Sequence, residues 1–151
     1  KLRPLLWQIL AFTLAHTVTL AAGALGWIVV VPSIVEPLIA ASIAYVAIEN
    51  IFVTRMSKWR PLVIFGFGLL HGLGFASVLG EFGLPQAQFI PALVGFNIGV
   101  EFGQLAVVAG AFLALGLWFG KKTFYRSVIA IPSSMVIAAV GLYWCVERVM
   151  G

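Results

Sequence analysis

Two histidines and two glutamates are the residues of this chain that could bind a metal ion in an apolar setting. His16, Glu49, His71 and Glu101 lie in four different hydrophobic stretches, and the chain contains no Asp. Imidazole and carboxylate ligands together suit Ni, Zn, Fe or Mn. Two neutral imidazoles and two carboxylates would also offset the charge of one divalent cation, which a low-dielectric interior requires. These residue types therefore predict a site for a divalent transition-metal ion.

The composition indicates which kind of structure must position these side chains. Hydrophobic residues make up 62% of the 151 residues and charged residues only 9%, whereas soluble domains carry about 25% charged residues. The net charge of +4 comes from short basic clusters between long apolar runs, so we expect a lipid bilayer rather than nucleic acid as the partner. We predict an all-α, polytopic transmembrane helix bundle that forms a single domain.

Five apolar stretches are long enough to cross the bilayer, which takes about 20 residues per helix. They cover roughly residues 5–31, 36–53, 62–79, 91–119 and 127–146. Four prolines are expected at or just before the first turns of their helices, where a missing N–H does no harm: Pro4, Pro37, Pro61 and Pro91. Pro132 leaves two alternatives open, because it either kinks the fifth helix or separates an interfacial segment over residues 125–131 from a shorter span.

The basic residues predict the orientation of the bundle. If the five spans alternate in direction, one side carries all of them except Arg148, which lies on the other; the majority set is Lys1, Arg3, Arg55, Lys58, Arg60, Lys121, Lys122 and Arg126. An excess of Lys and Arg marks the cytoplasmic side. The five tryptophans also fall at the predicted span ends, as expected for indoles at the headgroup level. We therefore expect a multi-pass protein of the plasma membrane with a cytoplasmic N-terminus.

The predicted metal ligands lie deep in the bilayer. His16, His71 and Glu101 are each about ten residues into a span, which places them about 15 Å deep and near the midplane. Glu49 should lie about 8 Å from the cytoplasmic face, as a fourth ligand, as a relay, or as a carboxylate paired with Arg55. An ionisable group inside the membrane costs several kcal/mol, so its default interpretation is functional.

Other polar residues and two sets of glycines accompany these groups. Helical spacing places a supporting set of polar side chains on the same faces as the ionisable residues: Thr13, Thr17, Ser42, Tyr45, Asn50, Asn97 and Gln104. Gly68 and Gly72 flank His71, and Gly95, Gly99 and Gly103 form a stripe on the fourth span. Because small residues let helix backbones approach closely, both sets are expected to pack against neighbouring helices.

Four segments, in order along the chain, resemble the HupE/UreJ family of bacterial membrane proteins. They are FTLAHTVTL (12–20), EPLIAASIAYVAIEN (36–50), FGFGLLHGLGFA (65–76) and FNIGVEFGQL (96–105). The first and third carry a single His each, which looks like the second branch of the family. The resemblance implies a nickel or other divalent-metal permease in the bacterial inner membrane, with hydrogenase or urease accessory functions. It leaves room for an extracytoplasmic domain or a metallochaperone as partner.

The function expected from the residues is transport or binding of a divalent metal, with nickel as the type that the resemblance implies. His16, His71 and Glu101 would be ligands, and Glu49 would be a fourth ligand or the cytoplasmic relay. A transporter or metal-binding protein is expected rather than an enzyme. Two alternatives stay open: an intramembrane metal-dependent hydrolase, and a haem protein with His16 and His71 as axial ligands. The residues do not choose among Ni, Zn, Fe and Mn.

Overall fold

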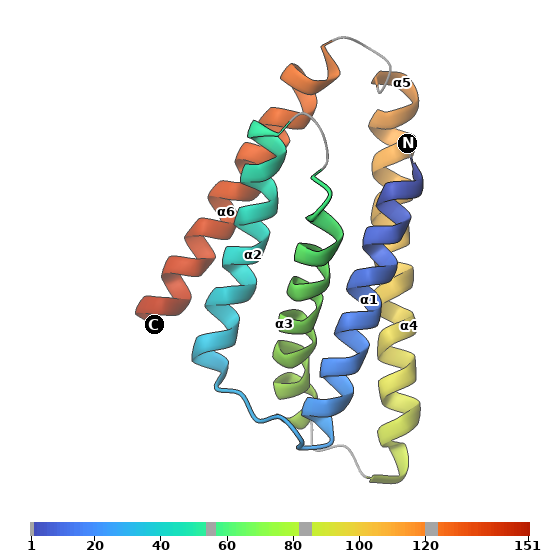
Figure 1. The fold of residues 1–151 in the computed structure, drawn as a ribbon, viewed down its shortest axis with the longest axis vertical. Helices are drawn as coiled ribbons and strands as arrows, with labels where there is room; N and C mark the ends of the chain where they lie inside the picture. The colour runs from blue at the N-terminus through green and yellow to red at the C-terminus, as the bar shows by residue number, and fades with distance from the viewer. Residues whose placement is uncertain (1, 54–56, 82–85, 120–123) are drawn as a thin grey trace.

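The chain folds into a bundle of long helices. The computed structural model describes residues 2–53, 57–81, 86–119 and 124–151, and these residues contain no strand. In chain order the elements are α1 (Leu2–Ala24), α2 (Pro32–Phe52), α3 (Arg60–Glu81), α4 (Gln86–Ala111), the π-helical η1 (Phe112–Gly116), α5 (Leu117–Phe119), the π-helical η2 (Tyr125–Ala130) and α6 (Ile131–Met150) (Figure 1). Within the described residues, five helical stretches are long and apolar enough to cross a membrane. The prediction of an all-α bundle with five spans is confirmed.

The first helix is shorter than predicted, because it ends at Ala24 rather than near Val31. Gly26 has a φ of 74°, a left-handed conformation that glycine adopts without steric cost. Its N–H donates to Gly23 O (3.0 Å), and the N–H of Trp27 donates to Ala22 O (2.9 Å). This pair of hydrogen bonds is a Schellman motif, which satisfies the last carbonyls of α1 and ends it.

Only two of the four prolines mark helix starts as predicted: Pro4 and Pro61 lie in the first turns of α1 and α3. Helix α2 begins at Pro32 and α4 at Gln86, so Pro37 and Pro91 lie inside their helices. Pro132 follows the π-helical turns of η2, and the chain remains helical from Tyr125 through Met150 as one span. Of the two alternatives for this region, a separate interfacial segment is therefore wrong.

Helices α1 and α3 make the most extensive contact of the bundle, and glycines allow it. A Cβ added at Gly68 would lie 2.6 Å from Phe12 O and 2.9 Å from the Ala15 Cβ. A Cβ at Gly72 would overlap the backbone of His16 and the hydroxyl of Thr19. The close approach predicted for Gly68 and Gly72 is confirmed, and it brings the backbone carrying His16 against the backbone carrying His71.

Helix α6 packs on α2 through another set of small residues. A Cβ at Gly141 would lie 3.0 Å from the Ala44 backbone N and 3.2 Å from Ala40 O, and Ser134 and Ala138 are buried. Helix α2 also contacts α3, so α2 lies between the α1–α3 pair and α6 (Figure 1).

Helix α4 packs chiefly on α1 and is the least enclosed helix. A Cβ at Gly95, Gly99 or Gly103 would meet nothing within 4 Å. The expectation that this glycine stripe packs against a neighbouring helix is therefore wrong for the described part of the chain. The polar side of α4 faces α1 instead, and its glycine side joins an apolar outer surface that suits lipid.

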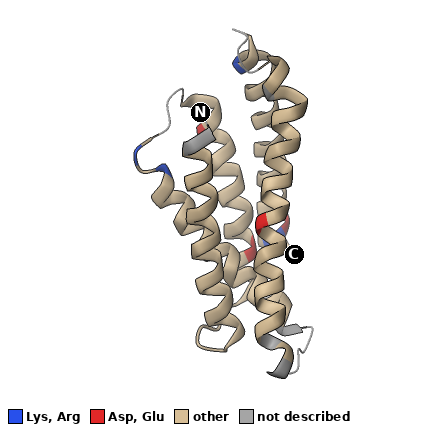
Figure 2. Ribbon diagram, turned by 90° about the vertical axis from the view of Figure 1, so that its right-hand side faces the viewer, with Lys and Arg blue, Asp and Glu red and all other residues tan. Residues whose placement is uncertain are grey.

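The two ends of the bundle differ in the charged residues that they carry. Arg60 pairs with Glu49 near the C-terminus of α2, and Lys58 precedes Arg60 in the chain; we call this end of the bundle the basic end. Figure 2 shows that most of the described Lys and Arg residues gather toward one end. Arg126 confirms this placement, since its Nη2 donates to Ile51 O at 3.0 Å. At the opposite end of α2, Arg148 pairs with Glu36 at 3.2 Å. Lys1, Arg55, Lys121 and Lys122 lie outside the described residues, and the side chain of Arg3 is not described.

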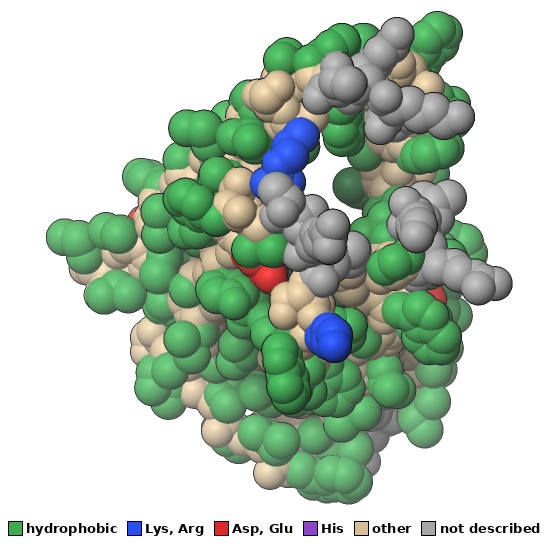
Figure 3. All heavy atoms as spheres, turned by 45° about the horizontal axis from the view of Figure 1, so that its top comes forward, with side chains coloured by type: hydrophobic (Ala, Val, Ile, Leu, Met, Phe, Trp, Pro, Cys, Tyr) green, Lys and Arg blue, Asp and Glu red, His purple; other side chains and the backbone are tan. Residues whose placement is uncertain are grey.

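The outer surface is suited to a hydrocarbon environment. Hydrophobic side chains cover most of the face seen in Figure 3, and only a few charged side chains interrupt them. All five tryptophans are exposed: Trp7, Trp27, Trp59, Trp118 and Trp144. An apolar surface this continuous would aggregate in water, whereas lipid tails solvate it.

Candidate functional site

His16 is buried completely in the middle of α1 and has an aromatic shell. Its exposed fraction is 0%, and its ring centroid lies 6.0 Å from Phe12, 5.4 Å from Phe75 and 6.0 Å from Phe96. Neither ring nitrogen has a hydrogen-bond partner within the described residues, although the Asn97 amide lies close enough to interact with the ring. A neutral imidazole carries one donor and one acceptor. An unsatisfied buried polar group of this kind calls for a specific explanation, such as an ion.

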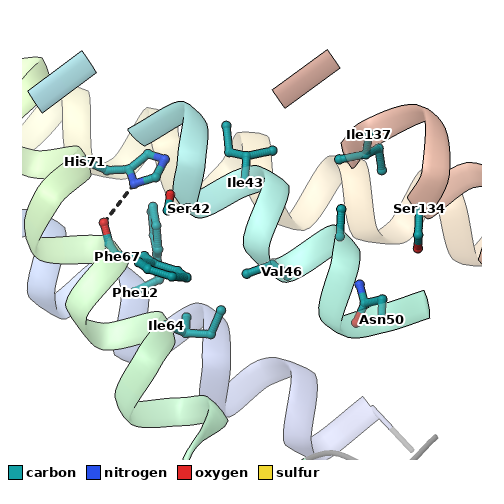
Figure 4. Close-up of a pocket in the computed structure, with 11 residues that line it drawn as sticks. Phe12, Ser42, Ile43, Val46, Asn50, Ile64, Phe67, His71, Ser134 and Ile137 are labelled. Carbon is teal, nitrogen blue, oxygen red and sulfur yellow. Dashed lines mark hydrogen bonds between the residues drawn. The ribbon is translucent and has the colours of Figure 1, made fainter. Parts of the chain in front are cut away.

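His71 presents one nitrogen whose protonation state the fold determines. Its Nδ1 lies 2.8 Å from Phe67 O, one turn earlier on α3. A carbonyl oxygen can only accept, so Nδ1 must carry the proton and donate it. The lone pair is then on Nε2, which Figure 4 shows on the side of the ring away from Phe67. Metal-binding histidines commonly donate their second ring nitrogen to a backbone carbonyl in this way.

Phe12 connects the two histidines. Its ring is stacked on His16 and meets the edge of His71 at a centroid distance of 5.1 Å. The structure thus brings His16 of α1 and His71 of α3 into one cluster, as their shared depth predicted.

A polar seam joins α1 to α4 beside this cluster. The Thr17 hydroxyl donates to Asn97 Oδ1 at 2.7 Å, and the Asn97 amide N–H donates to Leu93 O at 2.9 Å. Further along, Thr13 and Gln104 are 3.5 Å apart. Thr13, Thr17, Asn97 and Gln104 were predicted as supporting polar groups, and here they hold α4 against the helix that carries His16.

Glu101 lies on α4 between Asn97 and Gln104 and is half-buried. No hydrogen bond or ion pair involves it within the part of the chain that the structure describes. It borders a shallow cavity of about 300 Å³ whose lining comes from α4 alone. Among the described residues, no three His, Cys, Asp or Glu side chains gather in one group. The structure therefore joins His16 and His71 but does not bring Glu101 to them.

Glu49 lies near the basic end and pairs with an arginine that the sequence analysis did not select. Its Oε2 is 3.5 Å from Nη1 of Arg60, and both side chains are largely buried, with 13% and 12% exposed. The Nη2 of Arg60 also donates to Asn50 Oδ1 at 2.7 Å. Arg55, the partner considered from the sequence, lies outside the described residues. Arg60 is the first residue of α3 and lies opposite the end of α2. That position was the signal in the sequence that could have identified Arg60 as the partner of Glu49.

A cavity of about 270 Å³ connects the level of His71 to the level of Asn50. We call it the inner cavity. Helix α2 lines it with Val46 and Asn50, and α3, which runs antiparallel to α2, lines it with Phe67 and Ile64 (Figure 4). Helices α1 and α6 contribute additional residues. Most of the lining is apolar, and its polar members are Ser42, Asn50, His71 and Ser134.

Ser42 and Tyr45, the other predicted supporting residues on α2, make local contacts. The Ser42 hydroxyl lines the inner cavity and donates to Ile39 O at 2.7 Å, within its own helix. The half-exposed Tyr45 packs its ring edge-on against Phe67 of α3. Neither side chain contacts a histidine through a hydrogen bond within the described residues, so both support the packing around the cavity.

The fold and this site define a multi-pass helical membrane protein with a histidine pair in its interior. The family model described as HupE / UreJ protein matches residues 1–148. The chain therefore belongs to the HupE/UreJ family, which confirms the resemblance found in its four motifs. Comparisons with curated proteins and with solved structures gave no significant match.

Proposed function

We propose that this protein is a membrane permease for a divalent transition-metal ion, of the nickel or cobalt type, and that His16 and His71 form the core of its binding site. The family is associated with nickel or cobalt transport or accessory function. The observation that carries the proposal is the pair of imidazoles around Phe12, of which one has no hydrogen-bond partner among the described residues and the other has an unprotonated Nε2. Neutral imidazole nitrogens are good ligands for these ions.

Carboxylates complete the proposed site. Two imidazoles leave the charge of a divalent cation uncompensated, and an uncompensated charge in a low-dielectric interior is strongly unfavourable. Glu101 is the carboxylate on the polar side of α4, and α4 packs less extensively than the other long helices. In this proposal α4 moves against α1 when the cation binds, so that Glu101 becomes a ligand. Glu49 then receives the ion at the basic end.

The haem and hydrolase alternatives receive less support from the packing. A porphyrin coordinated by both imidazoles would have to displace Phe12, whose ring contacts each of them. A hydrolase needs room for a substrate beside a metal that both histidines hold; the inner cavity reaches His71, but His16 has no exposed surface. Transport of a bare ion requires no such room.

The test is metal content per folded protein. Purified protein is equilibrated with Ni²⁺ or Co²⁺ and assayed by elemental analysis in the His16→Ala, His71→Ala and Glu101→Gln variants. Each should lose most of the bound metal, and a double variant should lose little more, because ligands that act as a unit are not additive. Thr19→Val is the matched control, since Thr19 is buried in the same α1–α3 interface and bonds only backbone carbonyls. Unchanged metal content in both histidine variants would exclude the proposed site.

Glu49→Gln separates binding from transport. If Glu49 receives the ion after the histidine site, this variant keeps its bound metal while uptake into proteoliposomes slows. Loss of both properties would instead make Glu49 a ligand of the central site.

A further inference from the structure

Arg60 touches two cavities at the basic end: it lines one of them, and it bonds to Asn50, which lines the other. The inner cavity, which begins at His71, ends at Asn50. A second cavity of about 340 Å³, which we call the vestibule, is lined by Arg60 itself together with Ser57 and Lys58. The hydrogen bond from Arg60 to Asn50, at 2.7 Å, therefore joins the two residues that bound these cavities. Arg60 begins α3 eleven residues before His71, which corresponds to about 16 Å along the helix.

The groups that hold Arg60 are the ones that a divalent cation would use. Glu49 contributes a carboxylate oxygen and Asn50 a side-chain carbonyl oxygen, and Arg60 contacts both. Oxygens of these two kinds are ordinary ligands of divalent cations. Since the guanidinium neutralises Glu49, the closed arrangement needs no other cation.

The guanidinium is also not fully satisfied in this arrangement. Its Nε is buried and has no hydrogen-bond partner within the described residues. A buried donor without a partner weakens the closed arrangement relative to one in which water or another acceptor reaches it. The vestibule is lined by Arg60 and offers room for the side chain to turn away from Asn50.

We propose that Arg60 is a tethered counter-cation that closes the basic end of the inner cavity. Its guanidinium holds Glu49 and Asn50 until a divalent cation in the cavity competes for their oxygens, and the released arginine then turns into the vestibule. With Lys58 it also repels cations that approach from the basic end. This closure, the Arg60 latch, rests on the proposed function for its cargo, and its geometry can be tested without transport.

Thiol labelling measures the closure directly. In a Cys145→Ser background, Val46→Cys places a thiol halfway along the inner cavity. A membrane-impermeant methanethiosulfonate reagent is applied separately from each side of oriented proteoliposomes. Arg60→Gln should speed labelling from the basic end by about tenfold, the factor that corresponds to about 1.4 kcal/mol of lost closing interaction. Arg60→Lys keeps the charge and should leave labelling slow, which also guards against misfolding as the cause.

Two further measurements complete the test. Arg148→Gln is the matched control, because it removes the same charge from an exposed ion pair at the other end of α2, and labelling should not change. Ni²⁺ or Co²⁺ should speed labelling when Arg60 and Glu49 are both present, and should have no effect in Glu49→Gln. Equal labelling rates in Arg60→Gln and in the protein that retains Arg60 would overturn the latch, whatever the transport result. Absence of bound metal in the unmodified protein would overturn the proposed function, whatever the labelling result.

Discussion

Replacing Gly68 by alanine should weaken the bundle and the proposed metal site together, whereas the same change at Gly99 should do neither. A Cβ at Gly68 would stand 2.6 Å from Phe12 O, although ordinary contact begins at 3.4 Å. The clash is with backbone, so α1 and α3 must move apart by roughly the 0.8 Å that separates these two distances. At Gly99 an added Cβ meets nothing within 4 Å.

The magnitude follows from the comparison of the two variants. Overpacking of a close-packed interface costs about 1–3 kcal/mol. Alanine improves helix propensity by about 1 kcal/mol over glycine, and this gain is common to both positions. Gly68→Ala should therefore be about 1–3 kcal/mol less stable than Gly99→Ala, which corresponds to a difference of several degrees in Tm for a chain of this size.

Thermal unfolding in detergent, followed by loss of the monodisperse peak in size-exclusion chromatography, measures this difference. Metal content is measured on the same samples below the transition. Because Phe12 contacts both histidines, its displacement in Gly68→Ala should also lower metal affinity. Equal Tm values for the two variants would refute the assignment of Gly68 to the tight interface. A Tm loss confined to Gly99→Ala would show that a further partner covers α4.

Three further outcomes are expected. Reporter fusions after Trp27 and after Lys58 should report opposite sides of the membrane, with Lys58 cytoplasmic because Lys and Arg gather there; the same side for both would exclude α2 as a span, and an extracytoplasmic Lys58 would exclude the proposed orientation. Bound metal should fall as the pH is lowered, because an imidazole that gains a proton can no longer ligate; a pH-independent metal content would argue against imidazole ligands. Asn97→Ala removes the hydrogen bond between Asn97 and Thr17. It should destabilise the protein by about 0.6 kcal/mol, a typical value for an interhelical hydrogen bond in a membrane. An unchanged Tm in thermal unfolding would contradict the role of Asn97 in holding α4 against α1.

The fold was predictable from the sequence because the length and the hydropathy of each apolar stretch identify it as a membrane span. The shared level of His16 and His71 was predictable for the same reason, since depth depends only on the count of residues from a span end. The ends of the helices were harder to predict from the sequence. The end of α1 depends on the left-handed Gly26 and its two hydrogen bonds, a signal that was present in the sequence but that an apolar run from Leu25 to Val31 obscured.

Pairings between helices were not predictable from one sequence. Glycine spacing shows where a backbone could approach another, but it does not identify the partner. Gly68 and Gly72 meet α1, whereas the similar stripe around Gly99 meets nothing in the described residues. The ion pair between Glu49 and Arg60 likewise depends on the rotation of α3 relative to α2, which periodicity within one helix cannot supply.

The surroundings of His16 favour the cation binding that we propose. Three aromatic rings enclose the imidazole, and no hydrogen bond within the described residues satisfies its nitrogens. An unsatisfied buried polar group typically costs about 1–3 kcal/mol, so the cation-free fold carries this cost at its centre. A metal bound at the proposed site would satisfy the lone pair of the ring, and so would remove the part of this cost that comes from the acceptor nitrogen. The tight packing of α1 on α3 at Gly68 and Gly72 stabilises the fold enough to offset the cost of the unsatisfied imidazole. This packing does not involve the nitrogens of the His16 ring, which therefore stay available to the ion.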